Sequence, residues 1–404
     1  MVAKKNKLVF FDFVTHFGGA QQCTVLLCKA LKQFYDVYVI DAYGSCDKYT
    51  NALADIGITV RVLMPDSETV YIGYKDKRFR RIFRAFRQFP SFLVLRKRLE
   101  DAINHIDPDL VWVNGIKPLT FLAMIGTFRK FPVAMYAHGW YKKSQLSWFR
   151  RWLIKHCADC VLAVSNPTKE ALEGWGVPEN KIHVVFNTID FDNILEGASK
   201  EPVMPLPGMD KNYKILLPGL LARTKGQHVA IKAAGLLKRK GLDFVMWLAG
   251  DVSVGDKSGY RENLLEQIQA NGLEENIFLL GWRSDVQALM SLSDVVVLPT
   301  LTEGLPRAVQ EAMILRRPVI STPVGGITDL IINGETGLLV SVDDENALAQ
   351  GLEKVMLDKA FACQLAEKGH KHMCENFCTD RQIDLVREAF QCEIAKKQGK
   401  SNDK

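Results

Sequence analysis

The stretch VVVLPTLTEGLPRAVQEAMIL, residues 295–315, joins a short apolar run to a helix-length segment. The run 295–298 is β-branched and aliphatic, which is typical of a buried strand. Pro306 suits the first position of a helix, because the N–H that proline lacks would have no partner there. The stretch therefore predicts strand, loop and helix in that order, which is the repeating unit of a parallel sheet covered by helices.

The same alternation of apolar runs and helix-length segments extends along all 404 residues. We therefore expect an α/β protein made of two doubly wound, Rossmann-like domains. The expected strands are 7–13, 35–42, 58–64, 109–115, 132–138, 160–165 and 182–187 in the first half, and 214–219, 244–250, 277–281, 295–300, 318–322 and 337–342 in the second.

A proline-rich stretch separates the two series of strands. Pro202, Pro205 and Pro207 fall within six residues and forbid a regular helix or a central strand. Doubly wound sheets bind ligands outside the carboxyl ends of their strands, so two such domains facing each other predict an interdomain cleft. The expected parts are an N-terminal domain at 1–196, a linker at 197–212, a C-terminal domain at 213–380, and a C-terminal helix with a polar tail at 381–404, for which packing back on the first domain is one option.

Composition restricts the location of the protein. No apolar run approaches the roughly 18 residues that a membrane-spanning helix requires. The N-terminal run 8–11 is too short for a signal peptide and is followed at once by Asp12. The nine cysteines are an odd number, so we expect free buried thiols, including Cys157 and Cys160, in a reducing compartment. Together these features predict a cytoplasmic protein.

The positive charge is concentrated in one segment. Residues 1–200 contain 28 Lys and Arg against 19 Asp and Glu, a net +9, while the rest contains 24 against 27, a net −3. The segment 75–98 alone holds ten basic residues and one acid, and apolar residues at helical spacing in 79–89 predict an amphipathic helix. Such a helix suits an anionic membrane surface, here the cytoplasmic face of an inner membrane. Packing of its apolar stripe on its own domain is the equal alternative, and we expect no nucleic-acid partner, because no accompanying fold signature is present.

Several common site signatures do not occur in the sequence. No GxGxxG follows a strand, and the P-loop, HExxH and GxSxG motifs are missing. Asp107-Pro108-Asp109 has the DxD form of a metal–diphosphate site, but it precedes an expected strand and therefore predicts a helix-to-strand turn. Nothing in the sequence requires a metal.

The loop of the opening stretch carries groups suited to a polyol or an anion. Gly304 and Leu305 would present backbone N–H groups at the positive end of a helix. Glu303 and Glu311 flank the start of that helix, and ionised carboxylates accept strong hydrogen bonds from hydroxyl groups. On spacing alone, an ordinary helix with one solvated and one capping glutamate is the alternative.

The second half of the chain carries a series of further motifs around this loop. These motifs are Glu303-Gly304-Leu305-Pro306, Glu311-Ala312-Met313, Gly325-Gly326, 333–340 and, upstream, 219–226, 248–251 and 280–286. Together they resemble the retaining GT-B glycosyltransferases of family 4. The resemblance implies the GT-B fold and a hexosyltransferase that takes a nucleotide-diphosphate sugar, with a UDP-sugar expected and no cofactor.

The resemblance also implies roles for individual residues. Glu303 would contact hydroxyls of the donor sugar, the amides of Gly304 and Leu305 would face the sugar and the diphosphate, and Glu311 would hold the ribose. Lys225 would clamp the diphosphate as its charge builds up. The remaining donor-side matches are Gly250 and Asp251 in the cleft wall and Trp282 and Arg283 in the base pocket.

The sequence departs from the family pattern at one cation. Leu220 stands where the family carries arginine after Gly219. Arg223 lies three residues later, at a position where many relatives carry arginine. Arg307 is a second candidate, because a cation in the first turn of a helix opposes the helix dipole unless an anion is nearby.

The first half carries matches on the acceptor side. His138 ends an expected strand and corresponds to the histidine that the family places against the donor sugar. We therefore expect it to be catalytic together with Glu303 and Lys225, a core or capping histidine being the alternative. Gly18 and Gly19 resemble the family's glycine pair, which lets the backbone approach a ligand closely.

The sequence thus predicts a retaining glycosyltransferase acting on an acceptor hydroxyl. The basic segment favours a lipid-linked or lipopolysaccharide-type glycan as the acceptor. A nucleotide-sugar epimerase of the same fold and a non-catalytic glycan-binding protein are the alternatives.

Overall fold

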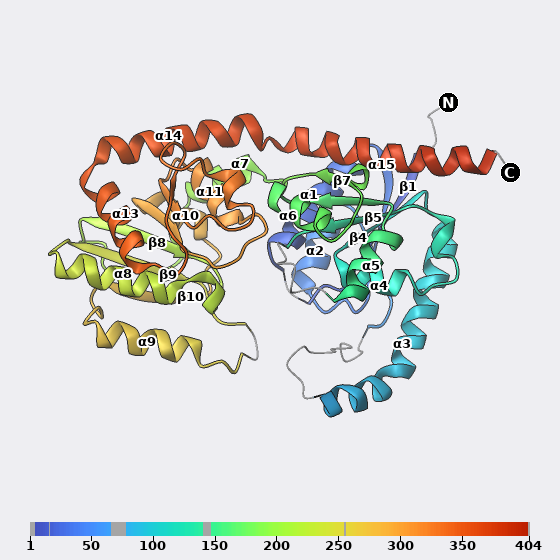
Figure 1. The fold of residues 1–404 in the computed structure, drawn as a ribbon, viewed down its shortest axis with the longest axis horizontal. Coiled ribbons are helices and arrows are strands. Elements are labelled where there is room, and N and C mark those ends of the chain that lie inside the picture. The colour runs from blue at the N-terminus through green and yellow to red at the C-terminus, as the bar shows by residue number, and fades with distance from the viewer. Residues whose placement is uncertain (1–4, 16, 66–77, 140–146, 254–255, 403–404) are drawn as a thin grey trace. The chain divides into compact units, whose positions relative to one another are not determined.

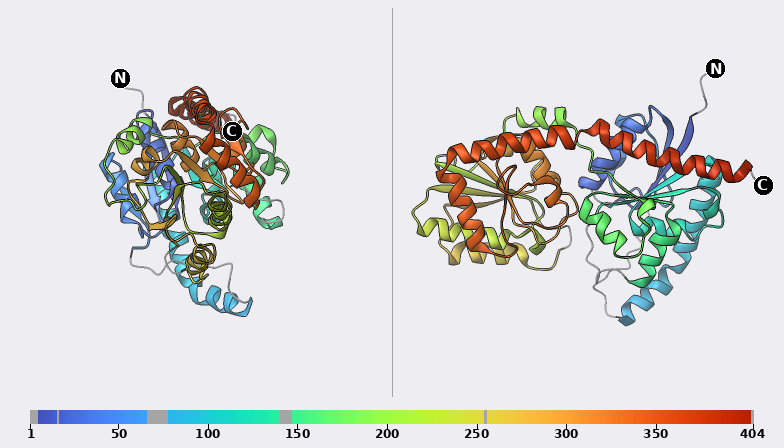
Figure 2. Two further views of the ribbon diagram at one scale, coloured as in Figure 1. Left: turned by 90° about the vertical axis from the view of Figure 1, so that its left-hand side faces the viewer. Right: turned by 45° about the horizontal axis from the view of Figure 1, so that its top comes forward.

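The computed structural model describes residues 5–15, 17–65, 78–139, 147–253 and 256–402, with the backbone alone for 78–88 and 400–402. The chain forms two compact units. Unit 1 comprises Met1–Thr188 and Thr379–Lys404, and unit 2 comprises Ile189–Cys378. Each unit is a parallel sheet with helices on both faces (Figures 1 and 2).

The sheet of unit 1 has the strand order β3-β2-β1-β4-β5-β6-β7, and every neighbouring pair is parallel. Its strands are β1 (Asn6–Asp12), β2 (Tyr35–Asp41), β3 (Val60–Val62), β4 (Leu110–Asn114), β5 (Val133–Ala137), β6 (Cys160–Ala163) and β7 (Ile182–Val184). Its helices are α1 (Gly19–Leu31), α2 (Asp47–Asp55), α3 (Arg78–Ile106), α4 (Ile116–Leu122), α5 (Trp148–Cys157), α6 (Asn166–Glu173) and α15 (Thr379–Asn402), with the short 3₁₀ helices η1 (Phe128–Lys130) and η2 (Glu179–Lys181).

The sheet of unit 2 has the order β10-β9-β8-β11-β12-β13, again with parallel pairs. Its strands are β8 (Tyr213–Pro218), β9 (Phe244–Ala249), β10 (Ile277–Gly281), β11 (Val295–Leu298), β12 (Val319–Ser321) and β13 (Leu338–Leu339). Its helices are α7 (Phe191–Ala198), α8 (Gln227–Arg239), α9 (Tyr260–Ala270), α10 (Val286–Leu292), α11 (Arg307–Ile314), α12 (Ile327–Leu330), α13 (Glu345–Leu357) and α14 (Lys359–Asn376), with the 3₁₀ helix η3 (Arg223–Lys225).

The central strands are apolar and buried on both faces, as parallel strands between two helical layers require. In unit 1 the C-terminal helix α15 belongs to this packing. The ring of Phe390 lies edge-on against Trp112 of β4, with 5.4 Å between ring centroids. Gln382 accepts a hydrogen bond from the N–H of Phe186 at 2.9 Å. Aromatic burial and this polar contact therefore attach the last helix to the first unit.

Most of the expected local structure is confirmed. Each of the expected strands overlaps a strand of the structure, although β3, β7 and β13 are shorter than expected. The DxD sequence is a turn, in which Asp107 has a φ of 52° and Asp109 accepts a hydrogen bond from the N–H of Lys7 at 2.8 Å. The segment 79–89 is helical as part of α3, although its side chains up to residue 88 lie outside the described residues. Among the described residues, no helix combines the length and apolar character needed to span a bilayer.

Two expectations need correction. The thiols are free, but Cys363, Cys374 and Cys392 are exposed rather than buried, because they lie on outward faces of α14 and α15. Pro306 is the N-cap of α11 and not its first residue, since Arg307 begins the helix. Cys157 and Cys160 are buried, as expected.

The strand order reverses beside the first strand of each sheet. In unit 1, β1 lies between β2 and β4, and in unit 2, β8 lies between β9 and β11. Connections that leave two such neighbouring strands run to opposite faces, which opens a crevice at the carboxyl ends of the strands. The fold therefore places one candidate binding position in each unit.

Gly250 follows β9, where its backbone lies against the loop after β8. A Cβ at this position would lie 1.9 Å from the carbonyl oxygen of Gly219. Gly250→Ala must therefore displace backbone, and we expect its free energy of unfolding in urea to fall by about 1–3 kcal/mol, the usual cost of overpacking. Gly399→Ala is the control, because nothing lies within 4 Å of that Cβ. Unchanged stability of Gly250→Ala would contradict this packing.

Candidate functional site

The loops that follow β8, β9 and β11 are hydrogen-bonded to one another in unit 2. The N–H of Leu221 donates to the carbonyl of Asp251 at 3.0 Å. The N–H of Leu301 donates to the carbonyl of Thr224 at 2.8 Å. Side chains from three loops distant in sequence are therefore held at one edge of the sheet.

The loop after β8 ends at a position that only glycine can occupy. Gly226 has a φ of +75°, and a Cβ there would lie 1.9 Å from the carbonyl oxygen of Pro299. The buried side chain of Gln227 donates a hydrogen bond to the carbonyl of Leu220 at 2.9 Å and so connects the two ends of the loop. These contacts explain the Lys-Gly pair physically, because the close approach at Gly226 brings Lys225 next to the β11 loop.

Lys225 and Glu303 form an ion pair between the two loops that flank the strand reversal. The Lys225 side chain is 26% exposed and that of Glu303 is 11% exposed. Each group therefore has its opposite charge as a partner while both remain within reach of solvent. A ligand that carries an anion and hydroxyl groups could take over both partners.

Helix α11 carries a second, more deeply buried set of charges. Arg307 and Glu311 pair at 3.2 Å one turn apart, and Gln287 of α10 donates to the other oxygen of Glu311 at 3.1 Å. Burial raises the pKa of Glu311, while Arg307 and Gln287 act in the opposite direction. Arg307 lies in the first turn of the helix, where a cation opposes the helix dipole unless an anion is nearby. Here that anion is Glu311 of the protein itself.

Gly304 and Leu305 lie three and two residues before the first residue of this helix. The carbonyl of Gly304 accepts a hydrogen bond from the N–H of Gly326 at 2.7 Å. The loop is thus fixed to the glycine pair that precedes α12. Leu305 is buried, so the N-terminal end of α11 is anchored rather than loose.

The remaining donor-side candidates differ in their exposure and in their hydrogen bonds. Asp251 lies directly after Gly250 and accepts a hydrogen bond from the N–H of Val252 at 2.8 Å. Leu220 is 45% exposed at the position where the family has arginine. Arg223 is exposed at the start of η3.

The segment after β10 presents one exposed aromatic side chain and one buried cation that is hydrogen-bonded within the protein. Trp282 is 65% exposed, following Gly281 with its φ of +68°. Arg283 is buried and donates two hydrogen bonds to Asp285, at 2.8 and 2.6 Å. Burial raises the pKa of Asp285, but the bonds from Arg283 and from the N–H of Val203 outweigh it and hold the pKa below its usual value. At this segment the structure offers an indole for stacking, whereas the guanidinium is already engaged.

In unit 1 the strand reversal contains a cavity of about 250 Å³. Polar groups from the ends of three neighbouring strands and from α1 and α4 converge on it. Its lining residues are Asp12, Phe13, Ala20, Gln21, Asn114, Gly115, Lys117, Pro118, Tyr136 and His138.

Asp12 is the buried anion of this cavity. Burial raises its pKa to about 6, although the N–H of Phe13 and the amide of Asn114 donate hydrogen bonds that lower it. The bonds measure 2.7 Å and 3.1 Å. Asp41, at the end of β2, raises the pKa further, and Lys117 lowers it. The carboxyl group therefore titrates near pH 6, well above the usual range of an aspartate.

His138 joins the same hydrogen-bonded chain. Its Nε2 lies 3.3 Å from Oδ1 of Asn114, and its ring packs on Tyr136 with 4.1 Å between centroids. Burial lowers the pKa of His138 to about 4, against the effect of a hydrogen bond with Asn187. The imidazole is therefore neutral at pH 7 and can exchange hydrogen bonds with a hydroxyl group, but it adds no positive charge.

The glycine pair begins α1 and directly precedes Ala20 and Gln21, which line this cavity. Gly18 is the N-cap, and its N–H donates to Oε1 of Gln21 at 3.1 Å. Gly19 is the first helical residue, next to the lining residue Ala20. Gly18 and Gly19 thus belong to the same unit as His138 and are adjacent in sequence to residues that line the cavity.

Sequence reasoning missed the charged residues Asp12 and Lys117 in unit 1 and the amide of Gln287 in unit 2. Asp12 and Lys117 could have been found, because Asp12 closes an apolar strand and Lys117 follows the end of the neighbouring one. Gln287 gave no signal, because its contact with Glu311 depends on how α10 packs against α11.

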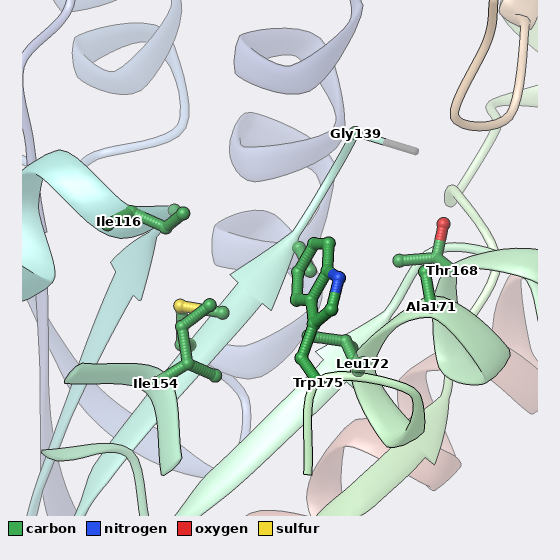
Figure 3. Close-up of a pocket in the computed structure, with 10 residues that line it drawn as sticks. Ile116, Gly139, Ile154, Thr168, Ala171, Leu172 and Trp175 are labelled. Carbon is green, nitrogen blue, oxygen red and sulfur yellow. The ribbon is translucent and has the colours of Figure 1, made fainter. Parts of the chain in front are cut away.

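A second cavity in unit 1 is apolar and holds about 10 Å³. Figure 3 shows it lined by Ile116, Ile154, Leu172 and the indole of Trp175. It has room for about one water molecule and few groups to bind one. It is a packing gap beneath α4 to α6 and not a ligand site.

Comparison with known proteins finds matches to glycosyltransferase families in both halves of the chain. Residues 206–372 match the family Glycosyl transferases group 1, and residues 17–193 match Glycosyltransferase Family 4. The two matches together cover most of the chain. Each of the two segments therefore resembles a family of glycosyltransferases.

Curated relatives cover part of the chain. WcaL of Salmonella typhimurium, named for glycosyltransfer in colanic acid biosynthesis, is 33% identical over 202 residues, 48% of this chain and 47% of that protein. An Escherichia coli protein named UDP-Gal:alpha-D-GlcNAc-diphosphoundecaprenol alpha-1,3-galactosyltransferase is 26% identical over 260 residues, 62% of this chain and 65% of that protein. The chain thus spans about half the length of WcaL and somewhat more of the galactosyltransferase.

The fold matches solved structures over nearly its whole length. The crystal structure of HepE from Anabaena in complex with UDP-glucose superposes with a TM-score of 0.78 at 20% identity, covering 96% of this chain and 100% of that one. With its two parallel-sheet units, the chain has the GT-B fold that the sequence predicted.

Proposed function

We propose that this protein transfers a sugar from a nucleotide-diphosphate sugar bound by unit 2 to a hydroxyl group bound by unit 1. The observation that carries the proposal is the pairing of Lys225 with Glu303 beside the start of α11, at the strand reversal of unit 2. Two relatives support the donor class, since HepE was crystallised with UDP-glucose and the galactosyltransferase is named for UDP-Gal. We therefore propose a UDP-sugar as the donor.

Donor binding would exchange the internal ion pairs for contacts with the ligand. Lys225 would turn to the diphosphate. The carboxylate of Glu303 would then accept hydrogen bonds from sugar hydroxyls in place of the Lys225 ammonium group. Glu311 would accept from the ribose while Gln287 holds its second oxygen. Arg307, released from Glu311, would add the positive charge that Leu220 lacks. Preorganised cations of this kind stabilise the charge that develops on a departing phosphate.

The reaction would then need no nucleophile from the protein. The bond from the anomeric carbon to the diphosphate oxygen breaks, and a bond to the acceptor oxygen forms on the same face of the sugar, which retains the configuration. The acceptor proton passes to the departing phosphate. The protein holds the two reactants in place and stabilises the leaving group.

The acceptor hydroxyl would lie in the cavity of unit 1. Asp12 would accept its hydrogen bond, and the neutral imidazole of His138 would contact the donor sugar, both oriented by Asn114. A lipid-linked or lipopolysaccharide-type glycan is the proposed acceptor, because the galactosyltransferase relative is named for a diphosphoundecaprenol-linked substrate. The basic segment 75–98 remains a proposed contact to the inner membrane.

The proposal is tested by incubation with a panel of nucleotide sugars, with and without glycolipid acceptors. A retaining transferase yields a glycosidic product whose anomeric configuration, determined by NMR, matches that of the donor. Epimerised sugar from donor alone would instead identify a nucleotide-sugar epimerase. Failure to bind any nucleotide in calorimetry would leave a glycan-binding protein.

Two single variants test the cation assignment. Lys225→Ala removes a charge-assisted contact to the diphosphate, so we expect UDP affinity to fall by about 1.5–3 kcal/mol, roughly 10–150-fold. Arg307→Ala should weaken UDP binding by a similar factor, as measured by calorimetry. Lys232→Ala, on α8 of the same unit, is the charge control. If Arg307→Ala binds UDP as the wild type does while Lys225→Ala does not, Arg307 does not replace the missing arginine.

The pH dependence of acceptor use tests Asp12. Its carboxylate must be ionised to accept the hydroxyl hydrogen bond, so kcat/KM for the acceptor should rise tenfold per pH unit below about pH 6 and level off above it. Asp12→Asn should lower the plateau and abolish that rise, with UDP affinity unchanged. A variant that keeps the wild-type pH profile would show that another group titrates.

A further inference from the structure

Helix α5 exposes a continuous group of aromatic rings that neither proposed site uses. Trp148, Phe149 and Trp152 are 73%, 42% and 47% exposed. Ring centroids are 6.0 Å apart for Trp148 and Phe149 and 6.4 Å apart for Phe149 and Trp152. The opposite side of the helix, with Leu153, Ile154 and Cys157, is buried in the core. We call the three exposed rings the aromatic face of α5.

The segment of sequence that contains this face has basic residues but no acidic ones. Residues 110–158 contain eight lysines and arginines and not one acid. On α5 itself the charges are Arg150, Arg151 and Lys155. The next acid, Asp159, accepts a hydrogen bond from the N–H of Val133 at 2.9 Å.

Further cations gather at the carboxyl end of α5. Arg129 donates to the carbonyl of His156 at 2.8 Å, and Lys181 donates to the carbonyl of Ala158 at 2.9 Å. These bonds to backbone oxygens leave the positive charges without carboxylate partners among the described residues. Helix α5 thus carries exposed indoles together with the cations Arg151 and Lys155, and Arg129 and Lys181 lie at its carboxyl end.

We propose that the aromatic face of α5 docks unit 1 on a lipid surface that carries anionic headgroups. Indole rings partition to the boundary between headgroups and acyl chains, and neighbouring cations bind the anionic leaflet. Helix α4 contacts both α3 and α5, so the three helices form one layer of unit 1 (Figure 1). Exposed Phe89 and Leu93 of α3 add apolar surface to that layer.

Two other partners fit the same surface less well. A second copy of this chain in a two-fold contact would bring the same cations against each other, which opposes association. Single-stranded nucleic acid prefers a positively charged groove lined with stacking rings, whereas these rings project from the outer side of a helix. The proposal goes beyond the transfer reaction, and vesicle binding can be measured with neither donor nor acceptor present.

The test compares the full chain on phosphatidylcholine vesicles with and without about one third phosphatidylglycerol. Wild type should co-sediment with the anionic vesicles. Brominated lipids in these vesicles should quench part of the tryptophan fluorescence of the wild type. This quenched part should be missing in Trp148→Phe/Trp152→Phe. Trp148→Ser/Trp152→Ser should lose binding at least about tenfold. Arg151→Ser/Lys155→Ser should lose about thirtyfold on anionic vesicles, about 1 kcal/mol for each cation.

Controls separate docking from folding and from catalysis. Leu357→Ser removes a side chain that is 67% exposed on unit 2 and should bind vesicles as wild type does. The aromatic variant should keep its melting temperature and its activity on a short water-soluble acceptor. The proposal would be overturned if wild type did not bind the vesicles or if the aromatic variant bound them as well as wild type does. It would also be overturned if the rings instead mediated self-association or oligonucleotide binding.

Discussion

The reversal of strand order beside β1 and beside β8 is the constraint on which both candidate sites depend. Parallel strands end at one edge of a sheet, and connections that diverge there leave room between them. In unit 1 this brings Asp12 and Asn114 together across 102 residues. In unit 2 it brings Lys225 and Glu303 together across 78 residues. The topology, more than any single motif, determines which polar groups meet.

The two sites satisfy their buried charges in different ways. Unit 2 pairs its charges internally, Lys225 with Glu303 and Arg307 with Glu311, so an incoming anion must exchange partners rather than meet bare cations. Such exchange favours a ligand that offers both phosphate charge and hydroxyl groups. Unit 1 instead keeps a neutral histidine and a carboxyl group with a pKa of about 6, which suits the recognition of an uncharged hydroxyl.

Particular residues show what the sequence could predict. The strands were predictable because fully buried parallel strands are continuous apolar runs, as in 295–298. Glu303 and Lys225 were found through the family resemblance, and the topology explains why they touch. The pairing of Glu311 with Gln287 depends on the packing of two helices, which no spacing in the sequence encodes. The outward cysteines of α14 and α15 were misjudged, because composition does not reveal which helical face a residue occupies.

The central claim is that the loop after β11 and the start of α11 hold an activated sugar nucleotide. It is tested most directly by a crystal structure of the protein with UDP bound. The account predicts the diphosphate against the amides of Gly304 and Leu305, with Lys225 turned away from Glu303 and the ribose hydroxyls on Glu311. Nucleotide density elsewhere, with both ion pairs of unit 2 intact, would contradict it.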